Sequence, residues 1–131
     1  MGRAMKQSFI SVFFFCILFG FSSTAFANDI AGIYLIKGAN PGSTETYSGS
    51  AILTPNGDGY SFVGTVNNHR YHGVGLYNKE KQILGMTYFN ENEVEVGQVM
   101  LDVEGNTLKG RWMDAKDKLM RTGWEIWKKQ D

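Results

Sequence analysis

After Asn28 the chain alternates apolar and polar residues with a period of two, in runs of about six to nine residues. This alternation is typical of β-strands that bury one face. No segment combines a helical stripe of apolar residues with end caps. The pattern predicts these strands: Ile30–Gly38, Thr46–Thr54, Tyr60–Val66, Tyr71–Tyr77, Ile83–Phe89, Val94–Val103, Thr107–Met113 and Leu119–Trp127.

Short segments rich in Gly, Asn, Asp and Pro separate these strands, as in Asn40-Pro41-Gly42-Ser43 and Asn56-Gly57-Asp58-Gly59. Gly, Asn and Asp tolerate the positive φ angles of short hairpin loops, and proline presets a turn. Short loops join antiparallel neighbours. We therefore expect each strand to pair with the next one along the chain.

Nearly every predicted strand contains a glycine. Glycine inside a strand costs about 0.5–1 kcal/mol relative to alanine, so its repeated use needs a steric reason. In a small closed sheet that reason is a sharp bend, a bulge, or room for a large neighbouring side chain. The pattern favours an all-β fold, a single small antiparallel up-and-down β-barrel of about eight strands. The glycines concerned are Gly49, Gly64, Gly73, Gly75, Gly85, Gly97, Gly110 and Gly123.

The first 27 residues differ in kind from the rest. Arg3 and Lys6 precede an apolar run, and Ala25-Phe26-Ala27 places small residues where signal peptidase reads them. The apolar run is shorter than the roughly 20 residues that span a membrane. We therefore expect a signal peptide over 1–27, cleavage after Ala27, and a single exported domain over 28–131 with no stable membrane anchor. Its location would be periplasmic or extracellular.

Composition excludes several kinds of site from the expected exported domain. The only cysteine, Cys16, lies in the expected signal peptide, which excludes a disulfide, a zinc–thiolate site and a cysteine nucleophile from residues 28–131. Those residues keep 11 basic side chains against 13 acidic ones, a net charge of −2. Nothing in this balance points to nucleic acid or an anionic membrane.

The two histidines, His69 and His72, do not form a recognisable site. Residues three apart on a strand face opposite sides, so both could bind one metal only if His69 lies in a turn. The sequence also places no carboxylate or nucleophile beside His72, and it contains no phosphate loop, serine elbow or metal-ligand motif. We expect no catalytic residue, no metal and no cofactor, with an enzyme of unrecognised type as an open alternative.

Alternation assigns Tyr71, Gly73 and Gly75 to the inner face of one strand, and His72 to its outer face. An eight-stranded barrel is either filled by side chains or holds one small ligand. The amount of ring volume favours a filled or nearly filled interior, with any remaining pocket shallow and near the mouth. The aromatic residues with inner parity are Tyr34, Tyr47, Tyr60, Phe62, Tyr71, Tyr88, Trp112 and Trp127.

Near the C-terminus, Gly123, Glu125 and Trp127 are spaced two residues apart, so on a strand all three would face the inside of the barrel. A carboxylate inside an apolar barrel must be hydrogen-bonded, paired or protonated. Glu125 is then a polar handle for a ligand. The favoured alternative is a salt bridge to Lys109, Arg111 or Arg121, or exposure with Trp124 and Ile126 inward. One of the two tryptophans should face outward and seal the barrel seam.

The order of glycines and aromatic residues along the chain is similar to that of a known group of proteins. It reads Gly32-x-Tyr34, Gly38-x-Asn40-Pro41, Tyr47-x-Gly49, Tyr60-x-Phe62, Tyr71-x-Gly73-x-Gly75, Leu84-x-Met86-x-Tyr88, Gly97, Gly105-x-x-Leu108-x-Gly110-x-Trp112 and Gly123-x-Glu125. This order resembles a family of small exported bacterial β-rich proteins of unknown function, some labelled fibronectin-binding. The chain departs from the family pattern at Gly64 and in the loop after Pro41. The Leu-x-Gly-x-aromatic strand is also similar to those of avidin and lipocalin-like barrels, which implies one open mouth.

We therefore predict an exported, non-catalytic binding protein that takes a small apolar or aromatic ligand at the barrel mouth. The alternative is a secreted or surface protein-interaction module, adhesin- or inhibitor-like, whose partner is an extracellular or envelope protein. The predicted ligand-binding residues are Tyr34, Tyr60, Tyr71, Tyr88, Trp112, Glu125 and Trp127.

Overall fold

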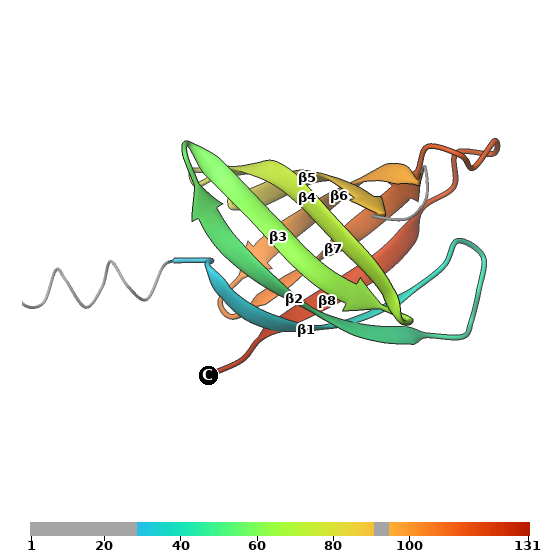
Figure 1. Cartoon of the computed structure of the whole chain (residues 1–131), viewed down its shortest axis with the longest axis horizontal. Coiled ribbons are helices and arrows are strands. Elements are labelled where there is room, and N and C mark those ends of the chain that lie inside the picture. Colours follow the sequence, from blue (N-terminus) through green and yellow to red (C-terminus); the bar gives the residue numbers. More distant parts are fainter. Residues whose placement is uncertain (1–28, 91–94) are drawn as a thin grey trace, which may run out of the picture.

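A computed structural model describes residues 29–90 and 95–131, and the expected signal peptide lies outside them. Each strand pairs antiparallel with the next, and the last pairs with the first to close a barrel (Figure 1). This confirms the prediction of an all-β, antiparallel, eight-stranded barrel. The strands are β1 (Gly32–Ala39), β2 (Tyr47–Asn56), β3 (Gly59–Val66), β4 (His69–Asn78), β5 (Ile83–Asn90), β6 (Val96–Glu104), β7 (Thr107–Asp114) and β8 (Gly123–Lys129).

The two ends of the barrel carry different connections. One end has the turns 57–58, 79–82 and 105–106, and residue 29 and the C-terminus lie there as well (Figure 1). We call it the closed end. The other end carries the longer connections 40–46 and 115–122, on the right of Figure 1, and we call it the open end. In the described part of the chain, no helix is long and apolar enough to span a membrane.

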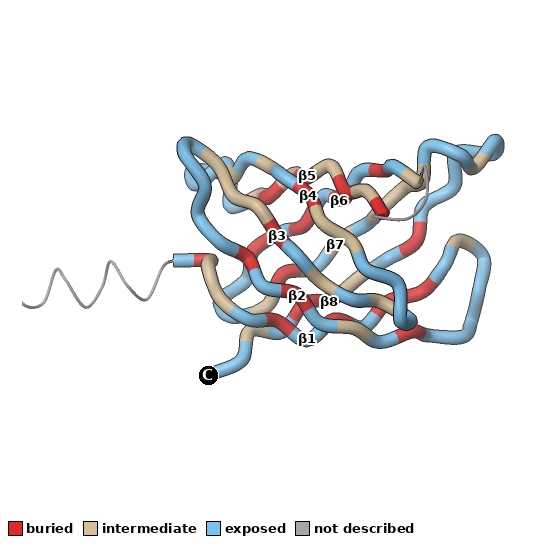
Figure 2. Tube along the Cα trace, viewed as in Figure 1, coloured by how far each residue is buried: buried red, intermediate tan, exposed pale blue. Residues whose placement is uncertain are grey.

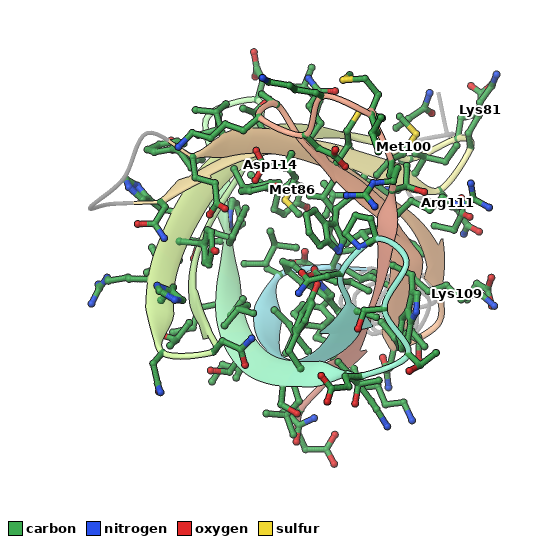
Figure 3. All side chains as sticks on the ribbon, turned by 90° about the vertical axis from the view of Figure 1, so that its right-hand side faces the viewer. Lys81, Met86, Met100, Lys109, Arg111 and Asp114 are labelled. Carbon is green, nitrogen blue, oxygen red and sulfur yellow. The ribbon has the colours of Figure 1, made fainter. Side chains whose placement is uncertain are left out.

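Burial alternates along the strands, as the sequence predicts (Figure 2). In β6, for example, Gly97, Val99, Leu101 and Val103 are buried and the residues between them are exposed. The inner face therefore forms the core. Side chains also separate cleanly by face: Met86 points into the barrel, whereas the exposed Lys109 points away from it (Figure 3).

Leucines fill the closed end. Leu53, Leu84, Leu101 and Leu108 have at most 1% of their surface exposed. Ile30 is buried in the same core although it lies before β1. The first strand thus begins two residues later than the alternation predicts, because the apolar side chain at its start packs into the core without joining the ladder.

The last strand also begins later than predicted, at Gly123 rather than at Leu119. Asp117 accepts hydrogen bonds from the backbone nitrogens of Leu119 (3.0 Å) and Arg121 (3.2 Å), and Met120 takes a positive φ of 53°. Both apolar residues are exposed, at 71% for Leu119 and 57% for Met120. An aspartate-centred turn therefore replaces the strand that the alternation suggested.

Large inward side chains lie directly across the ladder from glycines, for a steric reason. A Cβ at Gly123 would collide with the Trp112 ring, and one at Gly73 would collide with Phe62. This is the arrangement in which a ring covers a strand glycine. The cross-strand pairs are Tyr47 with Gly38, Phe62 with Gly73, Met86 with Gly75, Tyr88 with Gly97 and Trp112 with Gly123.

At each of these five glycines a Cβ would also meet a backbone carbonyl oxygen, and at other strand glycines the backbone is the main obstacle or there is none. A Cβ at Gly49, Gly64 or Gly110 would meet a carbonyl oxygen of the neighbouring strand. Gly85 is the exception to the expected steric role, because a Cβ there would have nothing within 4 Å. It lies on the outer face of β5, opposite Met100 of β6. The rule that each strand glycine makes room for a neighbour therefore holds for the inner face and fails at this outer position.

Candidate ligand site at the open end of the barrel

A cavity of about 280 Å³ lies inside the open end of the barrel. It is close to the lower limit of the roughly 300–1,000 Å³ of small-molecule sites, and about twice the 150 Å³ that accommodates benzene. The interior is thus filled at one end only, which corrects the expectation of a filled or nearly filled barrel. The lining residues are Ile36, Asn40, Tyr47, Ala51, Phe62, Gly64, Val66, Asn67, His69, Tyr71, Tyr88, Glu95, Val99, Trp112, Glu125 and Trp127.

The space results from unequal contributions of the strands. Besides the rings of Tyr47 and Phe62, β2 and β3 line the cavity with the smaller residues Ala51, Gly64 and Val66, whereas β5 and β7 contribute the rings of Tyr88 and Trp112. Small residues on one part of the wall leave volume that the rings do not fill. The cavity reaches the middle of the barrel, because Phe62 and Trp127 also line it.

Trp127 separates the cavity from the closed end. Its ring is 1% exposed and lies 5.8 Å from the ring of Tyr34 and 5.6 Å from that of Phe62. On the wall of the cavity, Tyr88 makes edge-to-face contacts with Tyr71 (5.8 Å) and with Trp112 (6.3 Å). Such contacts stabilise aromatic pairs beyond the area they bury, so the rings form a pre-organised wall.

Glu125 brings a carboxylate into this aromatic surrounding. The Tyr47 hydroxyl donates a hydrogen bond to Oε2 (2.6 Å), and the Trp127 indole nitrogen donates one to Oε1 (2.8 Å). Both donors are neutral, and each carboxylate oxygen can accept a further hydrogen bond. The side chain is therefore held in place with acceptor capacity left over.

The favoured sequence interpretation, a salt bridge from Glu125 or its exposure, is wrong. Lys109 pairs with Glu104 (3.3 Å) and Arg121 with Asp117 (3.2 Å). Within 29–90 and 95–131, no basic side chain forms an ion pair with Glu125. Parity explains the result for β7, because Lys109 and Arg111 occupy exposed outer positions there, whereas Glu125 shares the inner face of β8 with Gly123 and Trp127.

Burial controls the protonation of the site. Removal from solvent raises the pKa of Glu125 above its usual 4.5, while the hydrogen bonds from Tyr47 and Trp127 oppose the rise. The pKa of Tyr47 is also raised, first by burial and then by the charge of Glu125. Burial likewise raises the pKa of Tyr88. The phenols therefore stay neutral donors at neutral pH.

Trp112 carries a buried polar atom without a partner. Its indole nitrogen is inaccessible to solvent and has no hydrogen-bond acceptor among the described residues. Its proximity to the Tyr47 hydroxyl acts to lower the pKa of that group, against the larger effects of burial and Glu125 that raise it. An unpaired buried N–H costs free energy, and in this position it is tolerated because the ring covers Gly123 and lines the cavity.

The rim of the cavity is polar. The Tyr71 hydroxyl donates a hydrogen bond to Oε1 of Glu95 (2.9 Å), and Asn40 and the exposed His69 line the same opening. Sequence reasoning missed Glu95 and did not include Tyr47 among the ligand residues. Parity could have found Glu95, which lies just before β6, because it shares the inner positions of the predicted strand Val94–Val103 with Gly97.

The structure brings together five of the seven predicted ligand residues: Tyr71, Tyr88, Trp112, Glu125 and Trp127. Tyr34 and Tyr60 lie at the closed end instead. The Tyr34 hydroxyl donates to the carbonyl of Ile30 (2.6 Å), and burial raises the pKa of Tyr34 to about 12. Sequence parity identified the inner face correctly but carried no information about position along the barrel axis.

His72 lies on the outer face, where its ring stacks 3.9 Å from that of Phe89. Trp124 is also on the outer face, 38% exposed, opposite Ala39 of β1, so it lies at the seam between the first and last strands. In the part of the chain that the structure describes, no group of three or more His, Cys, Asp or Glu side chains is placed to hold a metal ion. The sequence matches no known family model and no curated protein.

Proposed function

We propose that this protein is an exported, non-catalytic binding protein that holds a small apolar or aromatic molecule in the open-end cavity. The observation that carries the proposal is the cavity of about 280 Å³, lined by aromatic rings and by the inward carboxylate of Glu125. Small-molecule sites are typically concave and mostly apolar, with few polar groups that fix orientation. Here Tyr88 and Trp112 supply the apolar wall and Glu125 the polar group.

Export is part of the proposal and is supported by the N-terminal pattern of charges, apolar residues and small residues. Secretion of the full-length chain followed by mass spectrometry of its new N-terminus tests it. The expected product begins at Asn28, and a product that retains residues 1–27 would contradict export by this route.

The alternative of a protein-interaction module would depend on the outer face rather than on the cavity. An enzyme would need converging catalytic groups, and the stacking of His72 on Phe89 keeps this histidine outside the cavity. The interior site therefore favours small-ligand binding over both alternatives.

Intrinsic fluorescence tests the binding proposal, because Trp112 and Trp127 line the cavity. Titration of the purified protein with a panel of single-ring compounds should give a saturable change for at least one of them. Val66→Phe fills the cavity from β3 and should abolish this change. Val63→Phe is the matched control, because residue 63 is on the same strand but 45% exposed on the outer face. Binding that survives Val66→Phe, or a panel without any response, would contradict the proposal.

A further inference from the structure

The cavity has a charge of one sign. Its described lining includes two carboxylates, Glu95 and Glu125, and neither lysine nor arginine. His69, which is exposed at the rim, is the one basic side chain in this described lining. A cleft lined by one sign of charge and apolar walls attracts the opposite charge.

Glu125 places a negative charge at a defined position inside the cavity. Its two hydrogen bonds come from neutral donors, the Tyr47 hydroxyl (2.6 Å) and the Trp127 indole (2.8 Å). Neutral donors orient a carboxylate but do not cancel its charge, and a charge removed from water without an opposite partner is costly. A cationic ligand would supply the missing partner.

The aromatic rings of the cavity wall suit a cation as well. Tyr71 and Tyr88 meet at an interplanar angle of 73°, and Tyr88 and Trp112 meet at 79°. Consecutive rings at such angles form corners rather than one flat wall. The negatively polarised faces of aromatic rings attract ammonium groups, and cages of this kind bind organic ammonium ions.

Taken together, these features refine the proposed small-ligand function, on which the following inference rests. We propose that the open-end cavity selects a small organic ammonium ion, with the ammonium group at Glu125 and an apolar body about one ring in size among Tyr88, Trp112 and Trp127. The size follows from a volume of about 280 Å³, which holds one ring with a short side arm.

Three probes of one shape but different charge test this inference on the purified protein. They are 2-phenylethylamine, which is cationic at pH 7, the neutral 2-phenylethanol and the anionic phenylacetate. Calorimetric titration should show the amine binding at least about tenfold more tightly than the alcohol, with the anion weakest. This comparison needs no variant, so it does not depend on how a substitution affects folding.

Glu125→Gln then tests the assigned residue. The amide keeps the size and one acceptor oxygen, so the alcohol should bind within about twofold of its original affinity, while the amine loses its advantage. Asp102→Asn is the matched control, because it removes the same charge from an exposed position on β6, outside the cavity. It should leave the ratio of the two affinities unchanged.

The outcomes separate the two proposals. Equal binding of amine and alcohol, or an unchanged ratio in Glu125→Gln, overturns ammonium selection and leaves small-ligand binding standing. Failure of all three probes, together with a silent fluorescence panel, overturns both. Tight binding of the amine that is lost in Glu125→Gln and kept in Asp102→Asn supports both.

Discussion

The two ends of the barrel use the same alternation of residues for opposite purposes. The closed end fills its interior with leucines such as Leu101 and Leu108, which are 0% exposed. The open end keeps a cavity and, among the residues that the structure describes, the Glu125 carboxylate without a basic partner and the Trp112 indole N–H without an acceptor. Close packing stabilises a fold, whereas unpaired polar groups and empty volume cost stability. The difference suggests that one end maintains the barrel and the other end is shaped for binding.

The largest effect is expected where the closed end is disrupted. Leu101→Ala should lower the free energy of unfolding by about 2–5 kcal/mol, because it leaves a cavity in a packed core. Met100→Ala is the control on the adjacent, outward position, 61% exposed, and should change stability by at most about 0.5 kcal/mol. Urea denaturation measures both. Similar losses for the two variants would show that the closed end is not packed as described.

A smaller effect of the same kind is expected at the open end. Gly123→Ala brings a Cβ against the Ala39 carbonyl oxygen and the Trp112 ring and should cost about 1–3 kcal/mol, with a change in the fluorescence of the cavity wall. Gly85→Ala is its counterpart, because a Cβ there has nothing within 4 Å. It should raise the free energy of unfolding by about 0.5–1 kcal/mol. If both substitutions destabilise equally, ring-over-glycine packing does not explain the wall.

These glycines show how far the sequence alone could lead. Alternation and turn residues were sufficient for eight strands in the right order, because a barrel strand is defined by local periodicity. Strand ends were less accessible: the turn around Asp117 depends on side-chain hydrogen bonds to Leu119 and Arg121, which periodicity does not encode. Parity places Glu125 on the inner face, but it does not indicate that the neutral donors Tyr47 and Trp127 hold its carboxylate in place of a basic side chain.

The position of the cavity could not be predicted for a different reason. Parity says that Tyr34 and Tyr88 share the inner face, but not that they lie at opposite ends. Position along the barrel axis depends on the register of the paired strands. The register places Gly38 beside Tyr47 and brings Glu125 within reach of the Tyr47 hydroxyl. Register is a property of paired strands, so the site emerges only when the barrel closes.

The smallest expected effect is a pH dependence of stability that arises from Glu125 at the open end and not from the closed end. Burial raises the pKa of Glu125 above its usual 4.5, so the folded state binds this proton more tightly than the unfolded chain does. Its contribution is fully present below pH 4.5 and is lost as pH rises through the raised folded-state value. Wild-type protein without ligand should therefore lose stability relative to Glu125→Gln over that interval, as measured by urea denaturation across pH. Leu101→Ala leaves the carboxyl intact and should stay below wild type by the same amount throughout. A constant difference between wild type and Glu125→Gln would mean that the carboxylate is as well solvated inside the cavity as in the unfolded chain.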